Sequence, residues 1–181
     1  MKYFIDTESI EDGETIDLIS IGIVAEDGRE YYAVNKNCNF KKASDWVEEN
    51  VLKPIGLNRL DGANINERRT TEATRITWGY MKLREFIKID LIDFLNPELH
   101  EVSEFWARHG DSDWTAFHQL LGTTGDLPER IPSHCRSVQQ ECDRLGGGVM
   151  TAATKCGQNA LENARWNKKA WEFLNGHIGK I

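Results

Sequence analysis

The chain has 181 residues, of which 40% are hydrophobic and 28% charged, and its formal net charge is -7 at pH 7. This length suits one buried core, so we expect a single domain over residues 1–181, and the negative charge argues against a protein that coats duplex nucleic acid through bulk positive charge. No apolar run approaches 18 residues and no export signal is visible, so we expect a cytoplasmic protein that does not enter a membrane.

The N-terminal part of the chain predicts a meander of three strands, over residues 2–6, 17–25 and 29–34. Gly28 follows Asp27 between the second and third strands, where a tight hairpin needs a residue with positive φ. Apolar residues fill most of the second strand, as expected for a strand that is covered on both faces. The sheet is therefore predicted to be central.

Downstream, helical spacing alternates with one further strand, at 102–107. A helix over 43–52 has Ser44 available as N-cap, and one over 113–121 ends at Gly122. Other helices are expected near 81–95, 136–145 and 159–174, with an exposed connection at 67–78. This order predicts an α/β three-layer fold with a mixed central sheet flanked by helices.

Three of these helices carry apolar stripes that we expect to be buried. The predicted buried residues are, in chain order, Met81, Phe86, Ile89, Leu91, Ile92 and Leu95, then Trp114, Phe117, Leu120 and Leu121, and finally Ala160, Leu161, Ala164, Ala170, Trp171 and Leu174.

The cysteines predict reduced thiols. Cys38, Cys135, Cys142 and Cys156 include no Cys-x-x-Cys pair, and His134 beside Cys135 lacks the further ligands that a structural zinc site requires.

Two acidic residues at the end of the first strand, Asp6 and Glu8, carry the strongest chemical signal. Side chains alternate along an extended backbone, so both carboxylates point to the same side of the strand tip. Such a pair repels unless a divalent cation neutralises it, and hard oxygen ligands suit magnesium or manganese. The pattern predicts a metal site, with an exposed strand end as the alternative.

Asp113, at the start of the helix over 113–121, is the third candidate ligand. A carboxylate there also suits helix capping, by Asp113 or by Asp111. An Asp-x-Glu pair on a strand together with an Asp at a helix start fits a two-metal phosphodiesterase, in which one carboxylate bridges two cations roughly 4 Å apart.

The chain as a whole resembles the small 3′-5′ exoribonucleases of bacteria and phages within the DEDD (DnaQ-like) superfamily. The resemblance rests on Asp6-Thr7-Glu8 within residues 3–13, on 18–34, on Asp111-Ser112-Asp113-Trp114, and on 117–122, 126–128 and 135–136. It implies a ribonuclease H-like fold, two Mg²⁺ or Mn²⁺ ions, and stepwise removal of nucleotides from a single-stranded 3′ end. It also implies that the substrate is RNA rather than DNA.

The chain departs from the last motif of that superfamily, a His followed five residues later by an Asp. Gln158 stands at the His position, which supplies the general base, and Asn163 stands at the Asp position, which supplies a metal ligand. A glutamine amide does not accept a proton near neutral pH, and asparagine brings no negative charge. Loss of a general base costs about 10²–10⁴ in rate, so we predict strongly reduced hydrolysis and a weakened first metal site.

No neighbouring residue is expected to replace the missing groups. Glu162 lies about 100° around the helix from Asn163, and His118 is expected to pack or to face solvent. The two changes fit either deliberate alteration of an active exonuclease or a natural pseudo-nuclease that binds or sequesters nucleic acid, nucleotides or a protein partner. A homodimer also stays open.

Substrate contacts are predicted from charge and aromaticity. Arg68 and Arg69 begin the densest basic stretch, which continues through Arg75, Lys82 and Arg84, and they are candidates for phosphate contacts. Trp114 beside the predicted site is a candidate for stacking on a terminal base, whereas Trp106 is expected to be buried.

Overall fold

The computed structural model describes residues 1–59, 77, 79–95, 103–129, 131–145 and 159–177. Its centre is a six-stranded sheet with the order β4-β3-β2-β1-β5-β6. The strands are β1 (Lys2–Glu11), β2 (Ile16–Ala25), β3 (Glu30–Asn35), β4 (Met81–Lys82), β5 (Glu104–Ala107) and β6 (Arg136–Ser137). Strands β1, β2 and β3 pair antiparallel, and the pairs β1 with β5, β5 with β6 and β3 with β4 are parallel. The predicted mixed sheet is confirmed.

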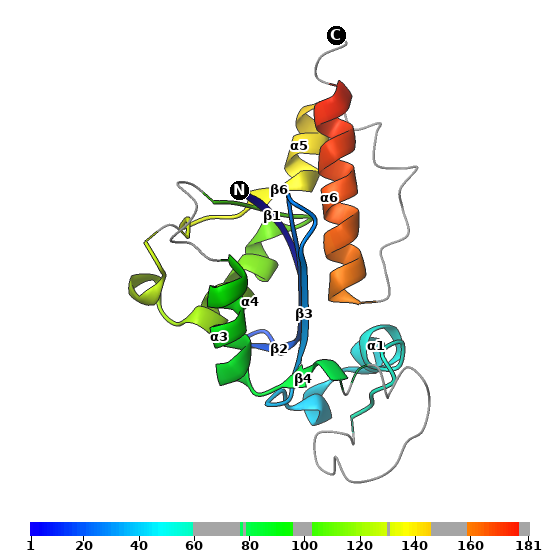
Figure 1. Ribbon diagram of the computed structural model, residues 1–181. Coiled ribbons are helices and arrows are strands. Elements are labelled where there is room, and N and C mark those ends of the chain that lie inside the picture. The colour runs from blue at the N-terminus through cyan, green and yellow to red at the C-terminus, as the bar shows by residue number, and fades with distance from the viewer. Residues whose placement is uncertain (60–76, 78, 96–102, 130, 146–158, 178–181) are drawn as a thin grey trace.

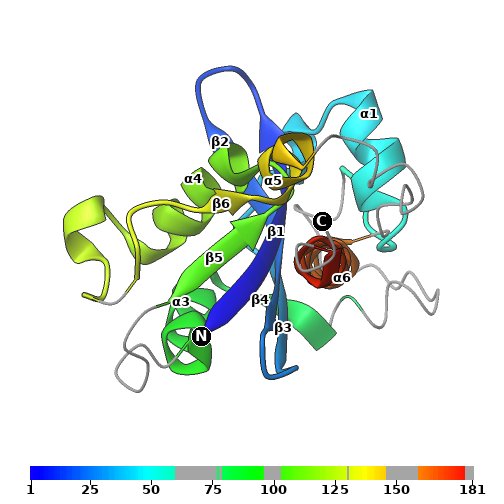
Figure 2. The same cartoon turned by 90° about the horizontal axis from the view of Figure 1, so that it is seen from above.

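Helices cover both faces of this sheet (Figure 1). Helices α3 (Arg84–Leu95) and α4 (Gly110–Leu121) lie on one face, and α1 (Asp45–Val47), α5 (Val138–Arg144) and α6 (Ala160–His177) lie on the other. Viewed from above, α6 is seen end-on beside β1 and β3 (Figure 2). The fold is therefore α/β, consistent with a ribonuclease H-like three-layer architecture. No helix in the described part of the chain is long and apolar enough to cross a membrane.

Strand β2 is buried on both faces, as its sequence predicts. Its residues from Leu18 to Ala25 are all buried, and Gly28 in the following hairpin has a φ of 92°. Strand β1, by contrast, is longer than predicted, because it continues past Asp6 to Glu11. Its register against β2 shifts between Glu8 and Ser9. The two carboxylates thus lie within a paired strand that bulges beside them, and not at a free strand tip.

The predicted buried face of the helix at 81–95 is only partly correct, since it includes the buried Leu91 and Leu95 but also three exposed residues. The helix begins at Arg84, and Met81 lies in β4, where it pairs with Val34 of β3. The residues that α3 buries are Ile87, Leu91 and Leu95, whereas Phe86, Ile89 and Ile92 are exposed by 53%, 61% and 37%. Both sets recur at helical spacing, and packing against the sheet determines that the set of Ile87, Leu91 and Leu95 is buried.

The other helices follow their predictions more closely. The Ser44 hydroxyl accepts a hydrogen bond from the Val47 N–H, and a short π-helix at Glu48–Leu52 continues α1. Helix α4 buries its predicted stripe and ends at Gly122. Helix α5 is preceded by β6, so the predicted helix at 136–145 begins two residues late. Of the cysteines, Cys38, Cys135 and Cys142 are free thiols, and Cys156 lies outside the described residues.

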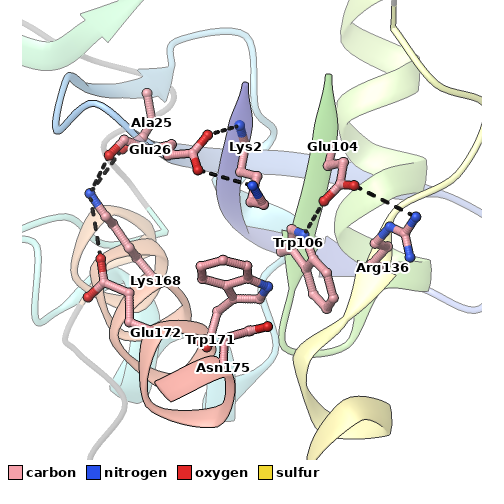
Figure 3. A network of polar contacts seen from close by, with 10 residues as sticks. All are labelled: Lys2, Ala25, Glu26, Glu104, Trp106, Arg136, Lys168, Trp171, Glu172 and Asn175. Atoms are coloured by element: carbon pink, nitrogen blue, oxygen red, sulfur yellow. Dashed lines mark hydrogen bonds and ion pairs between the residues drawn. The ribbon is translucent and has the colours of Figure 1, made fainter. Parts of the chain in front are cut away.

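A polar network ties the middle of α6 to the end of the sheet (Figure 3). Lys168 Nζ donates to the carbonyl oxygens of Ala25 and Glu26, at 3.2 and 3.0 Å. Glu26 in turn accepts from the backbone N–H and the ammonium of Lys2. The indole of Trp171 packs on Phe4 and Trp106, with ring centroids 5.7 and 6.1 Å apart. These contacts fix the direction in which α6 crosses the sheet.

Candidate active site

Asn163 of α6 joins the two carboxylates of β1. Its amide nitrogen Nδ2 donates to Oδ2 of Asp6 and to Oε1 of Glu8, both at 3.1 Å. Asn163 is 157 positions from Asp6 and 155 from Glu8 in the sequence, so only the packing of α6 on the sheet brings them together. One amide group therefore stands between two carboxylates.

A glycine in β2 allows α6 to come this close. Gly22 pairs with Asp6, and a Cβ atom at Gly22 would lie 2.4 Å from the carbonyl carbon of Ala160 and from the backbone nitrogen of Leu161. No side chain fits in that space, so the first turn of α6 rests directly on the backbone of the sheet. Asn159 caps this turn through a hydrogen bond of 3.1 Å from the Glu162 N–H to its Oδ1 atom. The position of Asn163 follows from this contact.

The oxygen of the Asn163 amide is buried and has no hydrogen-bond partner in the described structure. A buried polar atom without a partner is uncommon and costs free energy. Asn167, one turn later, is 1% exposed and donates through Nδ2 to the Ile5 carbonyl at 2.8 Å, and its Oδ1 atom is likewise without a partner. The N-terminal half of α6 thus presents two amides to β1, beside the buried Ala164.

Asp113 approaches β1 from the other helical layer. Its Oδ1 atom accepts hydrogen bonds from the backbone N–H and the hydroxyl of Thr7, at 2.8 and 2.7 Å. The N-cap residue of α4 is His109, which makes no side-chain capping bond. The side chain of Asp113 is therefore directed at the residue between Asp6 and Glu8, as a functional carboxylate would be and a cap would not.

The carboxylates are electrostatically strained. Burial, with a further contribution from the charge of Asp113, raises the pKa of Glu8 to about 7, although the Asn163 amide opposes this shift. Burial also raises the pKa of Asp113 to about 6, together with the charges of Asp111 and Glu11, against the two hydrogen bonds from Thr7. Each group would hold its charge more readily beside a cation.

We tested whether these residues fit a divalent cation. In the described part of the chain, no group of three or more His, Cys, Asp or Glu side chains is arranged to hold a metal ion. Asn163 directs its nitrogen at Asp6 and Glu8, and Asp113 is held by Thr7. Rotation of the Asn163 amide by half a turn would exchange its nitrogen for the unpartnered oxygen, and amide orientation depends on such partners. After that rotation Asp6, Glu8 and Asn163 would direct oxygen atoms at one another, and oxygen is the ligand type that a hard cation takes.

Several predicted site residues fall elsewhere. Gln158, Arg68 and Arg69 lie outside the described residues, so their predicted roles stay predictions. Trp114 is only 7% exposed and stacks on Phe117 with ring centroids 4.8 Å apart, which leaves little of its ring face for a base. His118 packs on the Trp114 ring, and burial lowers its pKa.

Sequence reasoning missed two partners of the site, Thr7 and Gly22. Thr7 lies between the two carboxylates and points to the opposite face of β1, so strand alternation was a sufficient signal that it would meet a different helix. Gly22 interrupts an apolar strand, and an isolated glycine in a strand often marks a close backbone approach.

The chain is similar to known proteins over most of its length. A family model described as the 3'-5' exoribonuclease Rv2179c-like domain matches residues 1–175. The chain is 37% identical over 165 residues to the 3'-5' exoribonuclease Rv2179c of Mycobacterium tuberculosis strain ATCC 25618 / H37Rv, a match that covers 91% of this chain and 88% of the relative. The 3'-5' exoribonuclease MT2234.1 of M. tuberculosis strain CDC 1551 / Oshkosh is similar to the same extent.

Proposed function

Since the chain belongs to the 3'-5' exoribonuclease Rv2179c-like domain family, we propose that it has the active-site framework of an enzyme that removes nucleotides from the 3′ end of single-stranded RNA. In this form we expect hydrolysis to be strongly impaired. The observation that carries both parts is the Asn163 amide, which lies between Asp6 and Glu8 and brings no negative charge.

We propose that Asp6, Glu8 and Asp113 hold two Mg²⁺ or Mn²⁺ ions, with Asn163 as a neutral ligand at the first site. When bound, such ions stabilise the negative charge that builds on the attacking and leaving oxygens. In the protein itself, Thr7 orients Asp113 through two hydrogen bonds, and the contact at Gly22 sets the position of Asn163. Gln158 stands at the general-base position of the sequence motif, and a glutamine amide does not accept a proton from water near neutral pH.

A second candidate function is binding without turnover, in which the same cleft retains a 3′ end, a nucleotide or a protein partner. The hydrogen bonds from Asn163 to both carboxylates favour it, because they neutralise part of the charge repulsion without a metal. A pseudo-nuclease of this kind would keep its fold and its groove while losing hydrolysis.

The deciding experiment compares this chain with its Gln158→His, Asn163→Asp double variant on a 5′-labelled single-stranded RNA in Mg²⁺ or Mn²⁺. We expect the double variant to shorten the RNA from its 3′ end at least about 100-fold faster, because it regains a base and a charged ligand. Asp6→Ala in the same background is the matched control and should abolish the gain. If neither chain cuts and both bind the RNA, the binding function replaces the enzymatic one.

A further inference from the structure

A pocket of about 460 Å³ lies beside the candidate active site, on the side of β5 and β6. Its lining comes from the start of α4, from the segment before β6 and from the start of α5, and includes His109, Trp114, His134, Cys135, Gln139 and Gln140. We propose that this pocket binds a nucleobase, most directly a base of the RNA whose 3′ end occupies the active site. The proposal therefore rests on the proposed function, and it adds a subsite to it.

The pocket shares its wall with the active site. Trp114 follows Asp113 in α4, so the helical turn that directs Asp113 at Thr7 also forms the pocket. Cys135 packs against the same turn, since a Cβ atom at Gly110 would lie 3.4 Å from its Sγ atom. Burial raises the pKa of the Cys135 thiol, and the charge of Asp113 raises it further. A nucleotide chain that leaves the carboxylates on this side would reach the pocket within a few residues.

The charges around the pocket favour a neutral ligand over a phosphate. The lining contains no Lys or Arg among the described residues, and Asp111 would repel an anion. The two nearby arginines are directed elsewhere: Arg108 lies over the Trp166 ring and Arg136 over the Trp106 ring, at 5.2 and 5.6 Å from the ring centroids. A phosphate would therefore meet no lysine or arginine in the described lining, whereas an uncharged ring would not be repelled by Asp111.

The side chains that do line the pocket suit a heteroaromatic ring. Glutamine amides supply a donor and an acceptor in one plane, the pattern that pairs with the edge of adenine, and histidine rings stack on bases in RNA complexes. Gln140 and His134 are exposed at the rim, where a ligand reaches them.

The pocket is largely preformed. Ser137 donates to the Arg108 carbonyl at 2.9 Å and accepts from the Gln140 N–H at 3.2 Å, which fixes the start of α5. Trp114 is held between Phe105 and Phe117, with ring centroids 4.9 and 4.8 Å away. A ligand therefore gains contacts without ordering a loop.

A first test uses nucleosides, which need neither metal nor turnover. Adenosine, uridine and ribose 5-phosphate are titrated separately into the full chain in EDTA, and the imidazole and indole resonances are followed by NMR. We expect a nucleoside to shift the resonances of His109 and His134, and ribose 5-phosphate to leave them unchanged. If ribose 5-phosphate alone shifts them, the pocket binds phosphate and the proposal is overturned.

A second test asks whether the base belongs to bound RNA. The affinity of a 5′-labelled RNA is measured by fluorescence anisotropy in Ca²⁺ for this chain and for the variants His134→Ala and Gln140→Ala. An abasic site is placed in turn at each of the last four positions of the RNA. At one position, the abasic site should weaken RNA binding to this chain about tenfold. The same abasic site should not weaken RNA binding to the two variants, because they already lack the side chain that contacts the base. Gln119→Ala, an exposed glutamine on the far end of α4, is the matched control. Thermal melting of each variant excludes misfolding.

The two tests separate failure of the subsite from failure of the proposed function. If the chain binds RNA and no abasic position couples to His134 or Gln140, the pocket is not a substrate subsite. If the chain binds nucleosides at His109 and His134 but not RNA, the pocket is a site for free nucleosides and the proposed RNA substrate is wrong. If neither ligand binds, both proposals are overturned.

Discussion

Strand β1 receives a polar side chain from each of the two helical layers, and the two contacts differ in one respect. On one side, α4 brings the carboxylate of Asp113 to Thr7, and the Oδ1 atom that faces the strand accepts two hydrogen bonds. On the other side, α6 brings the amide of Asn163 to Asp6 and Glu8, and its oxygen is left without a partner in the described structure. Both helices meet the strand through side-chain hydrogen bonds, but only α4 supplies a charged group.

This difference indicates that position and chemistry are separable in the site. The position of Asn163 depends on backbone contact between α6 and Gly22, which is independent of the residue type at 163. The capacity of the site for a cation depends on that residue type, because each lost carboxylate removes one unit of negative charge. Four changes would test this separation, and their expected effects decrease from the interior contact at Gly22 to an ion pair at the surface.

Gly22→Ala should have the largest effect, because it separates α6 from the sheet. The new methyl group would lie 2.4 Å from the backbone of Ala160 and Leu161, and backbone atoms cannot rotate away. We expect a loss of about 3 kcal/mol in the free energy of unfolding, measured in urea. Gly176→Ala in α6 is the control. Nothing lies within 4 Å of a Cβ atom at Gly176, so this variant should be as stable as the parent chain or slightly more stable. Equal stability of the two variants would show that α6 does not rest on Gly22.

Asn163→Asp should destabilise the metal-free protein by about 2–3 kcal/mol at pH 7.5, because it replaces the amide N–H donor by a third charge beside Asp6 and Glu8. Mn²⁺ should reverse this loss, since a ligand that binds only the folded state raises its stability. The measurement is the melting temperature in EDTA and in Mn²⁺. Asn167→Asp is the matched control. Its carboxylate would be buried against the Ile5 carbonyl, so Mn²⁺ should not restore the melting temperature of this variant.

Glu8→Gln tests the electrostatic strain through pH. The pKa of Glu8 in the folded protein, about 7, lies above its ordinary value of 4.5, so the folded state binds the proton more tightly than the unfolded state. The stabilising contribution of Glu8 to the free energy of unfolding is therefore fully present below about pH 4.5 and is lost as the pH rises through about 7. Between pH 5 and 7.5 in EDTA, the free energy of unfolding of the parent chain should fall because Glu8 loses its proton. In Glu8→Gln this fall should be smaller by about 2 kcal/mol. Identical pH profiles would contradict the strained pair, and the exposed Glu14→Gln serves as control.

The sequence predicts this site only in part, and the reasons are physical. Alternation along a strand is enough to place Asp6 and Glu8 on one side of β1. Their meeting with Asn163 was expected from family resemblance alone, because no local rule brings residues 155 positions apart together. The direction of the Asn163 amide depends on its partners in the folded protein, so sequence patterns do not determine it.

The same limit explains the errors in the fold. Helix α3 contains two sets of apolar residues at helical spacing, and which set is buried depends on the sheet beneath it. Phe86 and Ile89 were therefore assigned to the wrong side. Strand β4 contains only Met81 and Lys82, and two residues are too few for a periodic signal. By contrast, the mostly apolar β2 and the stripe of α4 needed no tertiary information.

Arg165 provides the smallest and most local test of how α6 is positioned. Its guanidinium forms two hydrogen bonds with Glu30 of β3, at 2.8 and 2.6 Å, beside the contact at Gly22. Both side chains are at least one-third exposed, and exposed ion pairs contribute about 0.5 kcal/mol. A double-mutant cycle of Arg165→Ala and Glu30→Ala should therefore give a coupling energy below about 1 kcal/mol. A coupling close to the cost of Gly22→Ala would mean that charge at the surface, and not backbone contact in the interior, holds Asn163 against the two carboxylates.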